Sequence, residues 1–277
     1  MDRVRGLSRE TRPRPLPQRN APYEASFFGP FRITLDGQPL REPARRRNRA
    51  RTLLKWFLLN PAEPFSGEQL CGLLWPDRTP ESAANSLHVT LHYLRHVLEP
   101  ALTPRGPSTF IRRTRHKCYW FDLKDLWWTD VLEVQVLDTA AKEAERRGES
   151  AGAIALYNQL IAYYRQTFLP EDVYEDVFTP YRRQHDFAHA RSLTCLMRLY
   201  LEASQLPNAL SYALQLLSVD PYSEDAVKTI VHVYLRQGNP TAAIHQLDDF
   251  LHTLKHDLGL APANELLTLR NTILFAR

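Results

Sequence analysis

The chain has 277 residues, of which 44% are hydrophobic and 24% charged, and it carries a net charge of +4 at pH 7. These values are ordinary for a globular protein long enough to form two domains. No apolar run approaches the ~20 residues of a membrane span, and Cys71, Cys118 and Cys195 lack paired spacing, which argues against a disulfide framework and a zinc knuckle and favours a cytoplasmic protein.

The charge is divided unevenly along the chain. Residues 1–125 contain 22 lysines and arginines against 12 acidic residues, whereas residues 126–277 contain 13 against 19. The balances of +10 and −6 together give the net charge of +4. This division suggests that the first half meets a polyanion and the second does not.

The chain begins with residues that have little to bury. Residues 1–22 include six arginines and four prolines, so we expect a disordered basic arm over residues 1–24. From Phe31 to Leu35 apolar and polar residues alternate, which predicts a strand, and Asp36-Gly37 supplies a hairpin turn. Residues 41–55 then hold seven cations and one acid, and form a basic entry to the first helix.

Three helices are predicted next. The first covers about 48–59 and stops before Pro61, and the second starts at the N-cap residue Ser66 and stops at Pro76. The third opens with Thr79 as cap and Pro80 at its first position. It carries one apolar stripe, formed by Leu87, Leu91, Leu94 and Leu98.

If this stripe faces the core, the opposite face of the third helix is exposed. That face and its flanks offer an amide, an apolar contact and hydrogen-bond donors, the groups that read base edges and bind phosphates. The candidate residues are Asn85, His88, Val89, His92, Tyr93, Arg95 and His96. A hairpin predicted after this helix places five further candidates at or next to its tip, Arg112, Arg113, Arg115, His116 and Lys117.

The histidines also suggest a metal site, because pairs four residues apart occur at 88/92/96, 185/189 and 252/256. No HExxH pattern occurs, however, and no cysteine or carboxylate stands at ligand spacing beside the first group. The sequence also lacks a GxSxG elbow and a glycine-rich phosphate loop. We therefore expect no metal, no cofactor and no enzymatic activity.

The second half is helical with a weak repeat. Tyr200, Ser204 and Ala209 match Tyr234, Gly238 and Ala243 at an offset of 34 residues, the period of tetratricopeptide helix pairs. Gly148 and Ala153 form a third copy, separated by an insertion of 22 residues. A generic helical bundle is the alternative interpretation.

Several phrases resemble one family, the antibiotic regulatory proteins (SARP family) of bacteria. They include FGPFRITLDGQPL, SGEQLCGLLWPD, LHYLRHVLEP and FIRRTRHKCYWFDL in the first half, and TDVLEVQVL and LKHDLGLAPANELLTL in the second. The resemblance covers about residues 25–275. It implies a mainly α protein, with an OmpR-type winged helix-turn-helix and small β-hairpins over residues 25–125. An all-α, tetratricopeptide-like bacterial transcriptional activator domain follows over residues 126–277.

The resemblance further implies a sequence-specific transcription activator that binds double-stranded promoter DNA. Contacts would come from the third helix as far as Leu94-Arg95 and from Arg113 and Arg115 of the hairpin. The loop Trp75, Pro76, Asp77, Arg78 and Thr79 would touch RNA polymerase. Members bind promoter repeats as homodimers or cooperative oligomers, and the helical domain serves self-association or regulation. One departure is that Cys118, rather than the family's glycine, precedes Tyr119.

An alternative function belongs to a different class. The chain could be a tetratricopeptide-type adaptor for other proteins, in which the winged helix does not bind DNA. The two functions differ in their expected salt dependence, because DNA binding weakens steeply as counterions compete for the phosphates.

Overall fold

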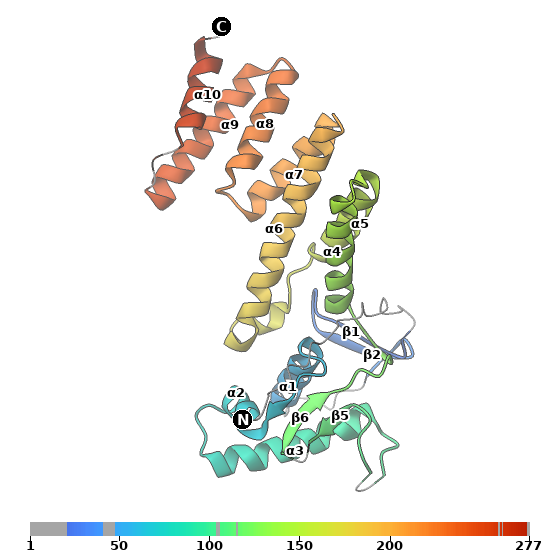
Figure 1. Cartoon of the computed structure of the whole chain (residues 1–277). Coiled ribbons are helices and arrows are strands. Elements are labelled where there is room, and N and C mark those ends of the chain that lie inside the picture. The colour runs from blue at the N-terminus through green and yellow to red at the C-terminus, as the bar shows by residue number, and fades with distance from the viewer. Residues whose placement is uncertain are drawn as a thin grey trace, which may run out of the picture. The chain divides into compact units, whose positions relative to one another are not determined.

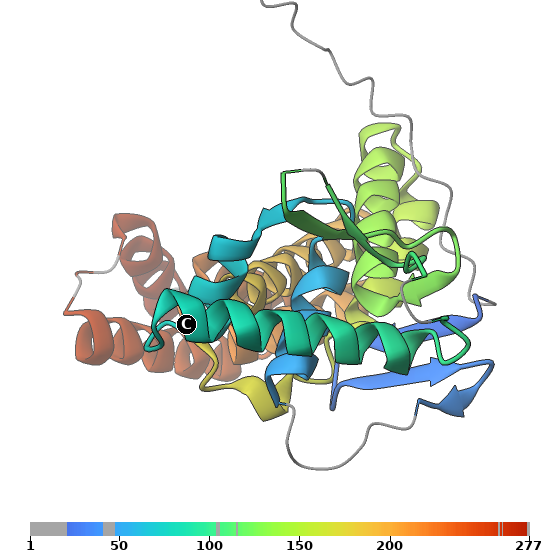
Figure 2. The ribbon, with the colours of Figure 1, turned by 90° about the horizontal axis from the view of Figure 1, so that it is seen from below.

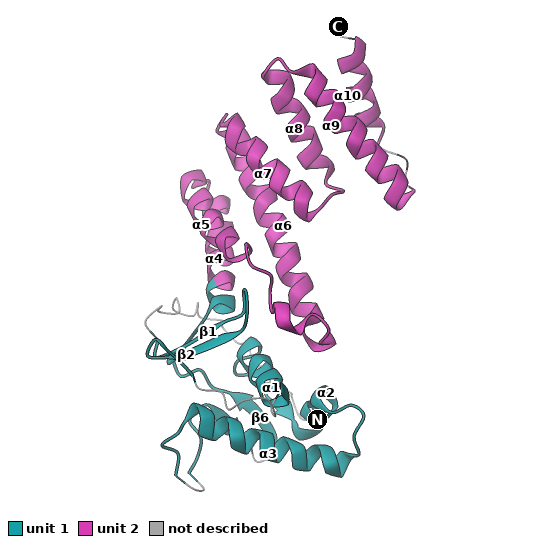
Figure 3. Ribbon diagram, turned by 180° about the vertical axis from the view of Figure 1, so that it is seen from behind, with its two compact units in different colours: residues 1–133 teal, residues 134–277 magenta. Residues whose placement is uncertain are grey.

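The computed structural model describes residues 21–40, 48–103, 106–114, 116–259, 261 and 263–275. Two compact units divide the chain, residues 1–133 and residues 134–277 (Figures 1 and 3). Most of the predicted basic arm (residues 1–20) and residues 41–47 of the basic entry lie outside the described residues.

The first unit contains a four-stranded sheet in the order β3-β2-β1-β7. Its strands are β1 (Tyr23–Ser26), β2 (Arg32–Leu35), β3 (Gln38–Pro39) and β7 (Trp127–Thr129). The predicted strand and turn are confirmed, because β2 and β3 pair antiparallel across Asp36 and Gly37, both of which have positive φ. Strand β1 and its parallel pairing with β7 were not predicted from the sequence.

Residues 23 and 24, which the sequence analysis assigned to the arm, are therefore strand residues. The Tyr23 ring stacks on Trp127 with 4.7 Å between ring centroids, and its hydroxyl donates a hydrogen bond to the Leu98 carbonyl at 2.6 Å. Both contacts join segments far apart in the sequence, so local patterns do not reveal them.

The start of helix α4 (Asp130–Arg146) is held in the same unit. The Asp130 carboxylate accepts hydrogen bonds from the backbone N–H groups of Phe27 and Phe28 at 2.7 and 2.9 Å. Burial raises the pKa of Asp130 to about 7. Strand β7 pairs with β1, and Asp130 accepts hydrogen bonds from the two residues that follow β1. The first compact unit therefore runs to residue 133, whereas the sequence predicted a boundary at 125.

Three helices complete the core of the first unit, and the structure confirms their predicted limits. They are α1 (Asn48–Leu59), α2 (Gly67–Leu74) and α3 (Pro80–Leu98). Ser66 caps α2 with a capping box, in which its hydroxyl accepts from the Gln69 N–H while the Gln69 side chain accepts from the Ser66 N–H.

The leucine stripe of α3 is buried as predicted. Leu87, Leu91, Leu94 and Leu98 have exposed fractions of 2, 2, 3 and 0%. Each fully buried leucine contributes about 1.5–3 kcal/mol relative to an exposed one, so the stripe fixes how α3 is rotated about its own axis.

The predicted basic hairpin is also confirmed. It belongs to a second sheet with the order β4-β6-β5, whose strands are β4 (Phe65–Ser66), β5 (Ile111–Arg113) and β6 (Cys118–Phe121). Figure 2 shows α3 along its length with this hairpin, the wing, beside it. Helices α1 to α3 with the wing make the predicted winged-helix arrangement.

The second unit is helical. Its helices after α4 are α5 (Ser150–Tyr163), α6 (Thr179–Glu202), α7 (Leu206–Val219), α8 (Glu224–Arg236), α9 (Pro240–Thr253) and α10 (Asn264–Phe275). Short helical turns lie at Pro170–Asp172, Asp176–Phe178 and Leu254–Leu258. The insertion foreseen between the first and second repeats corresponds to the segment between α5 and α6 and to the long N-terminal part of α6, a helix of 24 residues against 13 in α8.

All three predicted repeat copies are present as helix pairs α4–α5, α6–α7 and α8–α9. Gly148, Ser204 and Gly238 occupy the same place in the three turns and have φ values of 75°, 57° and 71°. Equivalent backbone hydrogen bonds close the turns, Glu149 N–H to Ala144, Gln205 N–H to Tyr200 and Asn239 N–H to Tyr234. Ala153, Ala209 and Ala243 are all fully buried, as close helix packing requires.

This turn geometry predicts opposite effects for two glycine substitutions in the second unit. Gly238→Ala should lower the free energy of unfolding by about 1 kcal/mol, because an L-residue is strained at φ 71°. Gly152→Ala, inside α5, should raise it by about 0.5–1 kcal/mol, because its added Cβ meets only ordinary contacts. Urea unfolding followed by circular dichroism measures both, and equal effects of the two substitutions would contradict the assignment.

Candidate nucleic-acid interface

The face of α3 opposite the leucine stripe is open. Asn85, His88, His92 and His96 are exposed, and Val89 is 68% exposed. Tyr93 is half-buried at the edge of this face. Six of the seven candidate residues on the helix therefore occupy one accessible side or its margin, and the seventh, Arg95, contacts the wing.

Two of the histidines on this face are close to one another. The ring centroids of His92 and His96 are 4.3 Å apart, and Nδ1 of His96 lies 2.9 Å from the His92 carbonyl oxygen. Because a carbonyl oxygen only accepts, this nitrogen donates. The neutral His96 ring then has Nε2 as a hydrogen-bond acceptor, and a protonated ring would have a second donor there.

Arg95 links α3 to the wing. It is half-buried, and its Nη2 donates to the Ile111 carbonyl at 3.2 Å. Burial lowers the pKa of Arg95 from the ordinary arginine value. The sequence predicts Arg95 as a DNA contact, and in the structure its guanidinium also contacts the wing.

The wing presents cations at its tip. Arg113 is exposed and stacks over the Tyr119 ring, with its guanidinium carbon 5.6 Å from the centroid. His116 and Lys117 are exposed, whereas Arg112 is half-buried and donates to the Ser108 carbonyl. Arg115 lies outside the described residues.

The turn of the wing does not need a glycine before Tyr119. The Thr114 N–H donates to the Cys118 carbonyl at 2.8 Å, and the Cys118 N–H donates to the Thr114 hydroxyl at 3.1 Å. Lys117, with φ 59°, takes the left-handed position of the turn. Cys118 is consequently an ordinary strand residue, and the departure from the family pattern leaves a closed hairpin.

The loop between α2 and α3 folds back onto the helix. The Arg78 N–H donates to the Trp75 carbonyl at 3.2 Å, which closes a turn. The Arg78 guanidinium donates to the Ser86 hydroxyl on α3 at 2.8 Å. Trp75 is half-buried, and residues 76–79 are exposed.

A cleft of about 440 Å³ lies between this loop, the start of α1 and one flank of α3. Its lining combines cationic, aromatic and polar side chains, among them Arg49, Trp75, Arg78, Asn85, Val89 and Tyr93. The cleft thus brings the loop residues together with residues of the exposed face. The sequence gives no sign that these two groups meet, and Arg49 stands in it as one of the seven cations of residues 41–55.

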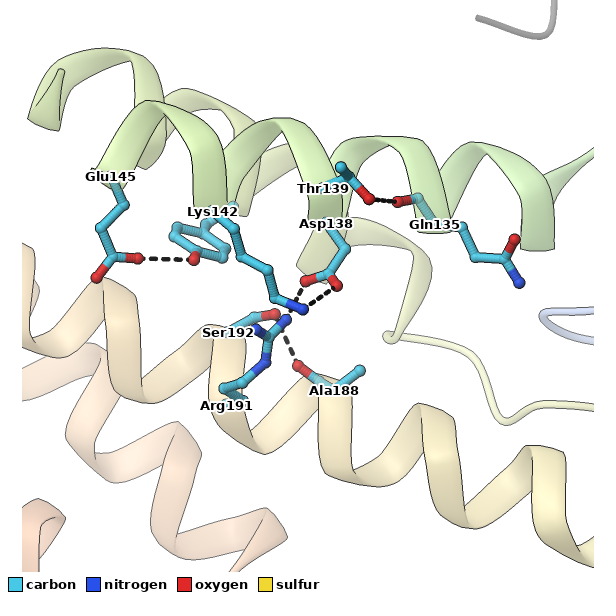
Figure 4. A network of polar contacts seen from close by, with 9 residues as sticks. Gln135, Asp138, Thr139, Lys142, Glu145, Ala188, Arg191 and Ser192 are labelled. Atoms are coloured by element: carbon cyan, nitrogen blue, oxygen red, sulfur yellow. Dashed lines mark hydrogen bonds and ion pairs between the residues drawn. The ribbon is translucent and has the colours of Figure 1, made fainter. Parts of the chain in front are cut away.

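The second unit contains a polar seam between α4 and α6, shown in Figure 4. Asp138 on α4 pairs with Arg191 on α6 and with Lys142 one turn along α4, the latter at 2.7 Å. Glu145 pairs with Arg198 and accepts a hydrogen bond from Tyr157 at 2.8 Å. The seam joins neighbouring helices of the repeat array and has the character of a structural contact.

The remaining histidines do not form a metal site in the described part of the chain. His185 is 6% exposed, lies against Phe168 with ring centroids 4.6 Å apart, and has its pKa lowered to about 4 by burial. Within the described residues, no three histidine, cysteine or acidic side chains are grouped to hold an ion. None of the helices among the described residues combines the length and the hydropathy that a membrane span needs.

Comparison with known proteins agrees with the geometry. Residues 129–274 match the family model of the bacterial transcriptional activator domain, and residues 41–121 match that of the C-terminal domain of transcriptional regulatory proteins. Both are families of transcriptional regulators, and neither is an enzyme family. No curated protein sequence matched the chain.

Among solved structures, the chain is similar to EmbR of Mycobacterium tuberculosis, determined in complex with a low-affinity phosphopeptide. The TM-score is 0.72 at 20% sequence identity, over 93% of this chain. At this identity the likeness concerns the fold alone, and the chain spans 66% of the length of the EmbR chain. The chain belongs to the bacterial transcriptional activator domain family and joins that domain to an OmpR-type DNA-binding winged helix, the domain organisation of SARP-type transcriptional regulators.

Proposed function

We propose that this transcriptional regulator is an activator that binds promoter repeats and recruits RNA polymerase. The observation that carries the proposal is the two-sided character of α3, in which a fully buried leucine stripe opposes an open polar face. A helix exposed in this way fits a major groove, which is wide enough to admit it.

Each part of the proposed interface has its own task. Asn85 has the amide geometry that pairs with adenine, and Val89 is placed to contact a thymine methyl group. His88, His92, Tyr93 and His96 add donors and acceptors along the same face. The wing binds the backbone or the adjacent minor groove through Arg112, Arg113, Arg115, His116 and Lys117. Arg95 adds a DNA contact where α3 meets the wing.

The proposed partners beyond DNA rest on the family. The exposed loop of residues 75–79 is the candidate contact for RNA polymerase. Promoter repeats call for a homodimer or a cooperative oligomer, because repeated half-sites are bound by repeated copies. The repeat array of the second unit serves self-association or regulation, and the protein acts in the cytoplasm, where the promoter is.

Duplex binding by the full chain tests the proposal. We expect log affinity to fall against log salt concentration with a slope of about −0.9 for every phosphate contact. We also expect added protein to increase transcription by purified RNA polymerase from a bound promoter. Fragments selected from genomic DNA supply that promoter. A chain without duplex affinity at low salt that instead binds a polypeptide would establish the adaptor alternative.

A further inference from the structure

We infer that the cleft beside α3 receives the sugar–phosphate backbone of one DNA strand, with Arg78 binding a phosphate. This inference rests on the proposed DNA binding and adds a site to it. It also changes the task of Arg78, which the family resemblance assigns to the loop that touches RNA polymerase.

The position of the cleft around the helix supports this assignment. With ~100° per residue, the leucine stripe lies on the side opposite Asn85 and His96. Ser86 and Tyr93 lie roughly 80–100° to one side of Asn85, and Arg95 lies about 80° to the other side. The cleft and the wing therefore lie on opposite flanks of the face proposed to read bases.

The dimensions of DNA explain why a flank should meet phosphates. A helix with its side chains is about 10–12 Å across, and the major groove is ~12 Å wide. A helix in the groove therefore fills it, and the two backbones pass along its flanks. The wing lies on one flank of α3, and the cleft lies where the other backbone would pass.

The chemistry of the cleft suits a phosphate. Arg78 is exposed and is held in place by its hydrogen bond to Ser86, which leaves its remaining guanidinium N–H groups for a phosphate oxygen. Arg49 lines the cleft from the start of α1. The hydroxyl groups of Ser86 and Thr90 donate to backbone carbonyls of α3, so they do not serve as donors to the phosphate. Trp75 adds apolar surface that fits the sugar.

This reassignment divides the loop. Trp75 and Arg78 line the cleft and belong to the DNA side, whereas Pro76, Asp77 and Thr79 are exposed and do not line it in the described structure. These three residues remain for a contact with RNA polymerase.

The test measures duplex affinity of the full chain as a function of salt for three variants. The slope of log affinity against log salt concentration should be less steep by about 0.9 for Arg78→Ala. The affinity of this variant should therefore fall roughly threefold less than that of the unchanged chain between 50 and 200 mM salt. Arg78→Lys keeps the charge and should keep the slope. Arg32→Ala, which removes an exposed arginine of β2 outside the cleft, is the matched control and should leave the slope unchanged.

An unchanged slope for Arg78→Ala would overturn the inference and leave the proposed function standing. Loss of transcription by that variant on fully occupied DNA would then assign Arg78 to the polymerase contact. Absence of duplex binding by the unchanged chain would instead remove the proposed function and the inference together. Circular dichroism of each variant excludes misfolding as the cause.

Discussion

Replacement of Leu91 by alanine is expected to lower the free energy of unfolding of the first unit by about 2–5 kcal/mol. Leu91 is 2% exposed and lies at the centre of the stripe that fixes the rotation of α3, so the change leaves a cavity in the core. A loss of this size is a large fraction of the stability of a domain. DNA binding should weaken with the folded fraction. Urea unfolding monitored by tryptophan fluorescence, with duplex binding in parallel, measures both effects.

The adjacent residue provides the control. His92 is exposed on the opposite face, so His92→Ala should change stability by no more than about 0.5 kcal/mol. It should alter duplex binding without unfolding the unit. If His92→Ala proved as destabilising as Leu91→Ala, the rotation of α3 described above would be wrong, and the face proposed to read DNA would be buried.

Replacement of Asn85 by alanine is expected to relax sequence preference at one base pair of the operator. If Asn85 pairs with adenine, the preference lost there should amount to ~1–3 kcal/mol, or about 5- to 150-fold in relative affinity. Competition binding with operators mutated one position at a time measures this preference. Asn85 is exposed, so stability should remain unchanged.

Arg113→Ala in the wing is the matched comparison, because a phosphate contact carries no direct base information. It should weaken binding to all duplexes alike and reduce the salt slope by about 0.9, with the sequence preference retained. An Asn85→Ala variant that keeps the full preference of the unchanged chain would remove Asn85 from the residues that read bases.

The secondary structure of the DNA-binding unit could be predicted where its signals are local. Ser66 indicated the start of α2, and Thr79 with Pro80 indicated that of α3, because these residues act on backbone groups of the same turn. The leucine stripe predicted which side of α3 is buried. The repeat turns were also predictable from local sequence, because similar residues at similar spacing adopt the same left-handed conformation at Gly148, Ser204 and Gly238.

Contacts between distant segments could not be predicted in this way. Tyr23 lies beside arginines and prolines in the sequence, and its backbone pairing with Leu35 and Trp127 makes it a strand residue. Arg95 is predicted as a DNA contact from its place on α3, but its hydrogen bond to the Ile111 carbonyl in the wing is not visible in the sequence. The partner in each case lies in a different element, and no periodicity records it.

The sequence by itself determined the class of this protein, its helices, the buried side of α3 and the basic character of its first half. Periodicity, capping and charge act between neighbouring residues, so they can be read along the chain. Tertiary structure alone decided that β1 pairs with β7, that Arg95 donates to the wing, and that Arg49, Trp75 and Arg78 meet α3 around one cleft. These arrangements depend on how the helices and sheets pack, which brings together side chains that the sequence keeps apart.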